Sequence, residues 1–331
     1  MTYRSSDDLV VHPDAEIESL AGVADDPRAV ARNTVKLGTA PITWGVSELD
    51  DWGVMLPSDR VLDEMAEVGY TGTELGPWGY LPKGAAALER ELRKRRLALA
   101  GAFCPVTLHD PARYEEQFAY AMETSRLLAD LGAPVLVLAE AGDAKRGRIA
   151  GRVRPTDPHF SEEEWKRFAN GANEVARRAK ELGLSCAFHP HAGTYVETPN
   201  EIDELLGRTD LSLVGLCLDT GHVYYGGGDP VALARRDPKR VRHVHLKDVY
   251  RDRYRRALER GLDFTAAVGE DVFAPVGAGS IDMAGVLGTL RDAGFDGWLI
   301  VEQDIRIAPG SSREPKLDAA KSYSFVTAEL G

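Results

Sequence analysis

The sequence of 331 residues contains few cysteines. Cys104, Cys186 and Cys217 are an odd number, and no two of them have the spacing of a C-x-x-C motif. This usage argues against a disulfide-bonded scaffold and indicates a reducing compartment. All three lie within or at the end of apolar runs, so we expect them to be small residues of the core.

Long hydrophobic runs are absent as well. No apolar segment approaches the length that spans a bilayer. The first residues, MTYRSSDDLVVHPDAE, have neither the basic n-region nor the apolar h-region of a signal peptide. We therefore expect a soluble, cytoplasmic protein that does not associate with membranes.

Positive charge is outnumbered by negative charge. The chain has 40 Lys and Arg against 52 Asp and Glu, which gives a formal net charge of −12. Proteins that bind nucleic acid normally present a basic surface, so this balance argues against a nucleic-acid partner. A small anionic ligand in a local basic pocket remains compatible with it.

What the sequence does contain is an alternation of short β-rich apolar runs with longer helical patterns, which starts near residue 35. Residues 1–34 are polar, acidic and aperiodic, and we expect them to be an extension outside a single domain of residues 35–331. The eight β-rich runs are 35–44, 69–76, 97–104, 134–141, 184–191, 214–222, 241–249 and 297–304.

The segments between these runs carry helix boundaries. Ser58 is a candidate N-cap for the helix after the first run. Ser161 and Glu164 have the spacing of a capping box, and residues 110–132 show a helical period that ends in glycine. Strands that alternate with such helices form parallel βαβ units, and eight units predict a (β/α)8 barrel. The alternative, an open doubly wound sheet, lacks its glycine-rich phosphate loop after the first strand.

Two connections are too long for simple turns. Residues 142–160 follow the fourth β-rich run, and residues 250–280 follow the seventh. In a barrel, both loops would lie at the C-terminal ends of the strands, where active sites are built. We expect them to cover a site as lids, with a solvated surface excursion as the alternative for the basic loop 142–160.

A barrel brings the C-terminal ends of all its strands to one rim. Carboxylates that converge there raise the pKa values of their neighbours unless a cation lies among them, and a divalent metal ion is such a cation. We expect Asp219, His245 and Glu302 to bind it, with Glu140 or His189 as the fourth ligand. The polar and aromatic residues at the predicted rim are Trp44, Glu74, Glu140, His189, His191, Asp219, His222, His245, Lys247 and Glu302.

Mixed nitrogen and oxygen ligands indicate Mn²⁺ or Co²⁺, with Fe²⁺, Zn²⁺ or Mg²⁺ as alternatives, rather than Ca²⁺. Each residue also has a structural alternative. Asp219 or Glu74 could cap the following helix, and Lys247 could be a surface lysine with a buried stem. His243 shares the alternating face of His245 one layer deeper, and we expect it to be a hydrogen-bonded core residue.

Other rim residues are candidates for contact with a substrate. Lys247 lies one layer nearer solvent than His245, a position that fits contact with a substrate oxygen or an enolate. His222 follows Asp219 by three residues and would overhang the pocket, where it could donate to a hydroxyl or transfer protons. We expect His189 and His191 to act with them in catalysis, and Trp44 and Glu74 to bind substrate.

Several motifs resemble the xylose-isomerase-like (β/α)8 superfamily of sugar isomerases, epimerases and dehydratases. They are LDTGH (218–222), HVHLKDV (243–249), PVGAGSIDM (275–283) and GWLIVEQD (297–304). Within the superfamily, further segments resemble the inosose dehydratases of inositol catabolism, and the resemblance covers residues 35–330. These segments are GTAPITWG (38–45), GTELG (72–76), APVLVLAEA (133–141) and FHPHAGTYVET (188–198).

The resemblance implies a set of site residues. The superfamily usually holds its metal with a Glu on strand five, an Asp on strand six, a His on strand seven and a Glu on strand eight. The last three match Asp219, His245 and Glu302, whereas the strand-five position is His189. Inosose dehydratases are also histidine-rich there and carry a strand-four Glu, which matches Glu140, so Glu140 is the favoured fourth ligand and His189 the alternative. The Asp-x-x-His motif, and the Arg six residues after the strand-seven His, match His222 and Arg251, both expected near substrate hydroxyls.

The resemblance further implies that the protein is a metal-dependent hydro-lyase.

 The reaction it implies is the removal of water from a keto-polyol such as 2-keto-myo-inositol (scyllo-inosose), through abstraction of the α-proton and stabilisation of the enolate. His189, His191 or Glu140 would take the proton, the metal and Lys247 would hold the enolate, and a protonated histidine, His222 or His191, would assist the leaving hydroxyl. Such enzymes are often homo-oligomers.

Other functions remain open. An isomerase or epimerase, or a lyase that eliminates from 3-keto-glycosides, C-glycosides included, could use the same metal site. The fold relatives also include an abasic-site endonuclease, which the net charge of −12 argues against. A non-catalytic sugar-binding barrel is a further class, although binding a neutral polyol requires no buried cluster of acids and histidines.

Overall fold

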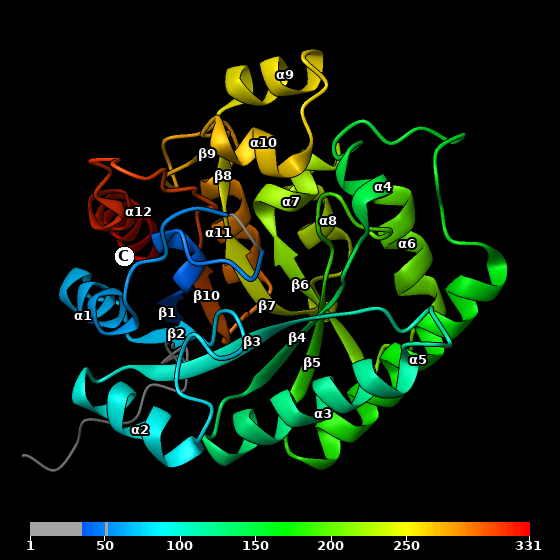
Figure 1. Ribbon diagram of the computed structural model, residues 1–331, viewed down its shortest axis with the longest axis horizontal. Helices are drawn as coiled ribbons and strands as arrows, with labels where there is room; N and C mark the ends of the chain where they lie inside the picture. The colour runs from blue at the N-terminus through cyan, green and yellow to red at the C-terminus, as the bar shows by residue number, and fades with distance from the viewer. Residues whose placement is uncertain (1–34, 50–51) are drawn as a thin grey trace, which may run out of the picture. The chain divides into compact units, whose positions relative to one another are not determined.

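The structure is a computed structural model that describes residues 35–49 and 52–331. Eight parallel strands close into a barrel in the order β1-β10-β7-β6-β5-β4-β3-β2, and helices lie around it (Figure 1). The predicted (β/α)8 fold is confirmed, whereas the predicted extension of residues 1–34 lies outside the described residues. The barrel strands are β1 (Lys36–Thr39), β2 (Gly72–Glu74), β3 (Ala98–Val106), β4 (Val135–Glu140), β5 (Ser185–His189), β6 (Val214–Asp219), β7 (Val241–Leu246) and β10 (Trp298–Val301).

Side chains alternate between the barrel interior and the surrounding helix layer. On β7, Val244 and Leu246 join the large core shared with the helices, so His243 and His245 face the interior. The position of a residue along its strand therefore decides whether it can reach a site inside the barrel. Two small clusters fill the interior elsewhere: Ala40, Ala100, Trp298 and Ile300, and Val135, Val137, Ala187 and Cys217.

The seventh β-rich run forms two strands rather than one. After β7, the short strand β8 (Asp248–Val249) pairs antiparallel with β9 (Phe273–Ala274). The Asp248 carboxylate accepts hydrogen bonds from the backbone N–H groups of Gly277 and Gly279. A Cβ at Gly279 would lie 2.2 Å from Asp248 Oδ1, so this position requires glycine. The glycine-rich segment 275–283 thus folds around the Asp248 carboxylate, and this contact holds the end of the long loop 250–280 next to β8.

Helix boundaries agree with the sequence patterns at most points. The Ser161–Glu164 capping box is present, but α1 begins at Ser58 itself, and Pro57 is its N-cap. No helix in the described part of the chain is long and apolar enough to cross a membrane. The helices are α1 (Ser58–Val68), α2 (Ala85–Lys94), α3 (Tyr114–Asp130), α4 (Ala144–Gly147), α5 (Glu162–Glu181), α6 (Pro199–Arg208), α7 (Thr220–Tyr225), α8 (Pro230–Arg236), α9 (Arg251–Glu259), α10 (Phe264–Gly269), α11 (Met283–Asp292) and α12 (Pro315–Leu330).

Both long loops contain short elements. The loop of residues 142–160 carries α4, and the loop of residues 250–280 carries α9 and α10, which lie together at the top of Figure 1. The first loop is tied down by Arg146, a fully buried side chain whose guanidinium binds both carboxylate oxygens of Glu201 at 2.8 and 2.9 Å. This bidentate pair fixes the loop against the start of α6.

Candidate metal centre and its cavity

Three of the predicted ligands meet at the C-terminal ends of the strands. Asp219 ends β6, His245 lies near the end of β7, and Glu302 follows β10. One ligand atom from each lies within 4.8 Å of the others. His245 Nδ1 is 3.3 Å from Glu302 Oε2 and 3.6 Å from Asp219 Oδ2. All three side chains are buried, so the group is shielded from solvent.

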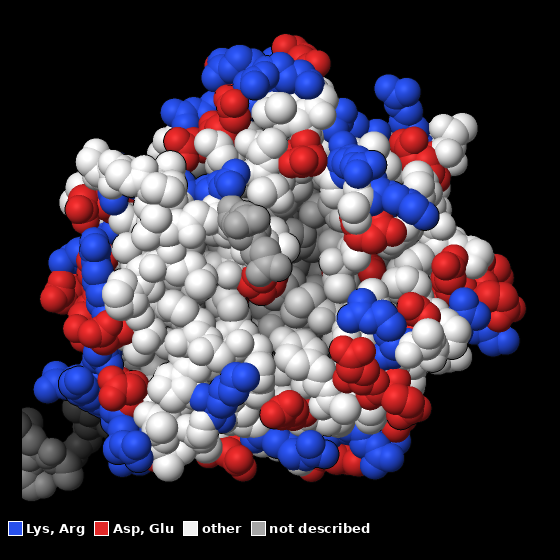
Figure 2. Space-filling model, in the orientation of Figure 1, with Lys and Arg blue, Asp and Glu red and all other residues white. Residues whose placement is uncertain are grey.

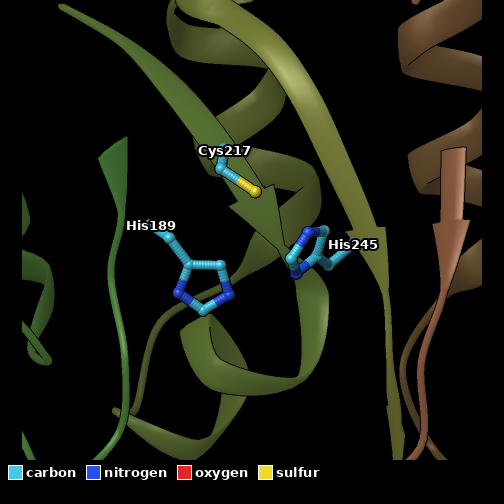
Figure 3. A group of neighbouring side chains, drawn as sticks. All are labelled: His189, Cys217 and His245. Carbon is cyan, nitrogen blue, oxygen red and sulfur yellow. The ribbon is translucent and has the colours of Figure 1, made fainter. Parts of the chain in front are cut away.

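His189, at the end of β5, belongs to the same group. Its Nε2 lies 3.3 Å from Asp219 Oδ2, and its ring centre is 4.9 Å from that of His245. Figure 3 shows both imidazoles beside Cys217 of β6. Burial raises the pKa of the Cys217 thiol to about 11, which keeps it protonated at neutral pH. Since metals bind the thiolate, the histidines and carboxylates are the better donors here.

Asp219 fulfils two roles with its two oxygens. Oδ1 accepts a hydrogen bond from the backbone N–H of His222 at 2.7 Å and so caps α7. Oδ2 faces His189, His245 and the Lys247 ammonium. Asp219 therefore caps a helix, as the structural alternative predicted, and also faces the metal-binding group. It uses a different carboxylate oxygen for each role.

Glu74, at the end of β2, lies beneath the group. Its Oε1 accepts hydrogen bonds from Nε2 of His243 at 2.7 Å and from Nε2 of His245 at 3.0 Å. Burial opposes the charge of Glu74, but the two histidines hold its pKa well below the usual range. The predicted core role of His243 agrees with this contact. Glu74 borders the cavity, but its carboxylate orients two histidines.

This contact decides which nitrogen of His245 faces the group. Burial opposes the charge of His245, but the neighbouring Cys217, Glu302 and Glu74 raise its pKa well above the ordinary value. With Nε2–H donated to Glu74, loss of the second ring proton leaves a lone pair on Nδ1, which has no hydrogen-bond partner in the described part of the chain. That lone pair faces carboxylate oxygens of Glu302 and Asp219, an arrangement that a divalent cation would satisfy. The donor set of imidazole and carboxylate groups suits Mn²⁺, Co²⁺, Fe²⁺ or Zn²⁺. These residues therefore fit a metal ion.

Lys247 lies immediately above the group. Its Nζ is 3.0 Å from Glu302 Oε2, 3.4 Å from Asp219 Oδ2 and 2.7 Å from Asp304 Oδ1. Burial opposes its charge, but the three carboxylates raise the pKa of Lys247 well above its ordinary value. Asp304 was missed in the sequence, although it follows Glu302 by two residues and therefore has the same alternation as that inward-facing residue.

His191 and His222 form the next layer toward the cavity, with ring centres 3.7 Å apart. His191 Nδ1 lies 2.8 Å from the carbonyl oxygen of Ala192, to which it donates, so its Nε2 carries the lone pair. His222 Nδ1 lies 3.2 Å from the backbone N–H of Ala192, and its Nε2 lies 3.0 Å from the Lys247 ammonium, which has donors only. Both ring nitrogens of His222 therefore face donors, whereas His191 presents an acceptor to the cavity.

Glu140 does not join the predicted ligands. On β4 it shares the alternating face of Leu136 and Leu138, which pack in the outer core, and it belongs to no metal-binding group among the described residues. Its Oε2 instead accepts from the backbone N–H groups of Gly142 and Tyr195. The geometry favours His189 over Glu140 as the fourth ligand, because β5 places the His189 side chain in the barrel interior, next to Asp219 and His245.

Two predicted substrate-binding residues also lie elsewhere. Trp44 is fully buried in the short 3-10 helix Pro41–Trp44, where its indole N–H donates to Glu64 Oε2 at 2.7 Å. Arg251 is the exposed first residue of α9. Neither lines the cavity described next. Trp44 is displaced because β1 ends at Thr39 and a helical turn follows, whereas Arg251 is displaced by the β8–β9 pair.

A cavity of about 1350 Å³ opens above the metal-binding group. Figure 2 shows it as a hollow in the face of the molecule. Both long loops contribute to its wall, 142–160 through residues such as Arg148 and 250–280 through residues such as Phe264. The predicted site residues that line it are Glu74, Glu140, His189, His191, His222, His245, Lys247 and Glu302.

The protein is thus a parallel eight-stranded barrel with a buried cluster of carboxylates and histidines at the C-terminal ends of its strands, the face on which TIM-barrel enzymes build their active sites. The family model described as "Xylose isomerase-like TIM barrel" matches residues 62–326, and the chain belongs to this family.

The chain is 35% identical over 288 residues to the inosose dehydratase of Lacticaseibacillus casei, an alignment that covers 87% of this chain and 96% of that protein. It is 39% identical over 286 residues to the rhizopine catabolism protein MocC of Rhizobium meliloti, with 85% and 86% covered. Among solved structures, the IOLI protein with a zinc atom has a TM-score of 0.64 at 18% identity, with 89% of this chain and 98% of that chain covered, which shows the shared fold.

Proposed function

We propose that the protein is a metal-dependent hydro-lyase that removes water from a keto-polyol of the inosose class. The observation that carries the proposal is the convergence of Asp219, His245 and Glu302, with His189, around one buried centre next to Lys247. The similarity to inosose dehydratases supports the reaction and the substrate class. A divalent cation held by these four residues would polarise the ketone of the substrate as a Lewis acid.

The charge of the cavity supports a neutral substrate. Arg148 and Lys247 are the only Lys or Arg side chains among the described residues that line it, whereas acidic side chains are numerous there. Lys247 is already surrounded by the carboxylates of Asp219, Glu302 and Asp304. A phosphate group would meet mainly negative charge, so a neutral polyol fits better than a sugar phosphate.

His191 is the proposed base. Because its Nδ1–H is donated to Ala192, its Nε2 offers a lone pair, and the side chain lines the cavity. It would accept the proton from the carbon next to the ketone, and the electron pair of that C–H bond would form the enolate. Lys247 would donate a hydrogen bond to the enolate oxygen, where negative charge accumulates.

His222 is the proposed acid. Its Nε2 lies 3.0 Å from the Lys247 ammonium and 3.7 Å from Asp304 Oδ2, so Lys247 would supply the proton that converts His222 to an imidazolium. When the enolate collapses to the ketone, a carbon–carbon double bond forms and the C–O bond to the β-hydroxyl breaks. The imidazolium would give this proton to the departing oxygen, which leaves as water, and the ring would return to its neutral form.

The test is product analysis with scyllo-inosose. The protein is freed of metal with a chelator, reloaded with Mn²⁺ or Co²⁺, and incubated with the substrate, and the products are followed by NMR and mass spectrometry. Loss of 18 mass units only with the reloaded protein is the expected outcome. Full dehydration after exhaustive chelation would contradict the proposal. Inversion of a stereocentre without loss of water would indicate an epimerase instead, and release of an aglycone from a 3-keto-glycoside would indicate the alternative lyase.

A further inference from the structure

The wall of the cavity has two chemically different halves. The half built from β5, β6, β7 and β10 carries the histidines, the carboxylates and Lys247 described above. The other half, built from the segments that follow β1 and β2 together with β3 and α3, is apolar and aromatic. Its residues include Ile42, Met55, Trp78, Tyr80, Phe103 and Tyr120.

The aromatic side chains of this half remain partly exposed. Trp78, Tyr80 and Tyr120 are neither buried nor fully exposed, and Trp78 packs edge-on against Tyr120 with ring centres 6.1 Å apart. Met55, on the same wall, is 53% exposed. Large apolar groups that line a cavity and stay uncovered are typical of a ligand-binding surface.

The cavity is also larger than one ring requires. Its volume of about 1350 Å³ exceeds the range of roughly 300–1,000 Å³ that is typical of pockets for drug-sized ligands. Phe103 lies beside the metal-binding half, with its ring centre 5.5 Å from that of His189, so it can contact the keto ring itself. Trp78, Tyr80, Tyr120 and Met55 are left for a second part of the substrate.

We infer that this wall is a subsite for a neutral aromatic substituent carried by the keto ring. The inference rests on the proposed function for the position of the ring at the metal centre. Aromatic rings pack favourably edge-to-face against other aromatic rings, which the Trp78–Tyr120 pair offers. Glu48 and Asp59 border the same half, so an anionic substituent would be repelled.

The test compares two ligands that differ only in their substituent. Binding of phenyl and methyl 3-keto-β-D-glucosides to the Mn²⁺-loaded protein is measured by calorimetry. We expect the phenyl compound to bind at least 10-fold more tightly, and the variants Trp78→Ala and Met55→Asp to abolish this preference while leaving the affinity for the methyl compound unchanged. Tyr114→Ala is the control for Trp78→Ala, because Tyr114 is also a partly exposed aromatic residue but does not line the cavity.

Equal affinities for the two compounds would overturn the inference, as would a phenyl preference that survives in both variants. The result is independent of the reaction. If scyllo-inosose is not dehydrated but the phenyl preference holds and depends on Trp78, the proposed reaction fails and the subsite stands. If scyllo-inosose is dehydrated and the phenyl group gives no gain, the subsite fails and the reaction stands.

Discussion

Oε1 of Glu74 accepts a hydrogen bond from Nε2 of His245 at 3.0 Å, and both side chains are buried. The bond fixes the ring so that Nδ1 faces Asp219 and Glu302. We expect Glu74→Gln to weaken Mn²⁺ binding about 10- to 100-fold, because an amide neither carries the negative charge nor enforces the tautomer. Calorimetric titration of the metal-free variant with Mn²⁺ measures this. Glu67→Gln on the surface of α1 is the control, and equal affinity in the two variants would refute the role.

Asp219 allows its two functions to be separated. Asn is as good an N-cap as Asp, so Asp219→Asn can retain the bond to the N–H of His222 but lacks the charge that faces the metal centre. We expect this variant to lose Mn²⁺ binding with little change in its free energy of unfolding. Asp219→Ala loses the cap as well and should be destabilised by about 1 kcal/mol more. Urea unfolding and Mn²⁺ titration measure the two effects, and normal Mn²⁺ affinity in Asp219→Asn would exclude Asp219 as a ligand.

Glu140 leads to a prediction about pH. Burial raises the pKa of this carboxyl to about 7, although the N–H groups of Tyr195 and Gly142 oppose the shift. Since the pKa in the folded state lies above the unfolded value of 4.5, stability is greatest below pH 4.5 and is lost as the pH rises through 7. The loss amounts to roughly 3 kcal/mol at pH 8 and above.

Glu140→Gln removes this titration. Glutamine is similar in shape and can accept from the same two N–H groups, so we expect the variant to be more stable than the parent at pH 8 and the difference to vanish near the unfolded pKa. Urea unfolding across the pH range measures this, with Mn²⁺ affinity as the second readout. Reduced Mn²⁺ affinity without a gain in stability would indicate that Glu140 is a ligand after all.

The sequence predicts the barrel well because each strand is bounded by helix signals. It predicts the positions of His245 and Lys247 because polar side chains mark the inward face of β7. On β4 no polar residue distinguishes the inward face before Glu140, because the run PVLVLAEA is apolar on both faces, as parallel strands usually are. The inward or outward direction of Glu140 was therefore not readable from the pattern.

The other differences have local causes. Pro41 lies inside the first β-rich run, and a proline there favours the helical turn that carries Trp44 away from the rim. The pairing of β8 with β9 depends on contacts between Asp248 and a segment about 30 residues away, which no local pattern reveals. Asp304, in contrast, could have been found from the alternation that identifies Glu302.

Arg146 gives the last prediction, on the loop of residues 142–160. Its guanidinium is fully buried and binds Glu201 through two hydrogen bonds, and Glu201 also accepts from the N–H of Thr198. Removing one partner of a buried ion pair leaves the other charge uncompensated, which costs about 3–5 kcal/mol. We therefore expect Arg146→Met to lower the free energy of unfolding by this amount and to expose the loop to proteolysis. Lys145→Met, at the exposed neighbouring position of α4, is the matched control, and an equal loss of stability in both variants would show that the buried pair does not hold the loop.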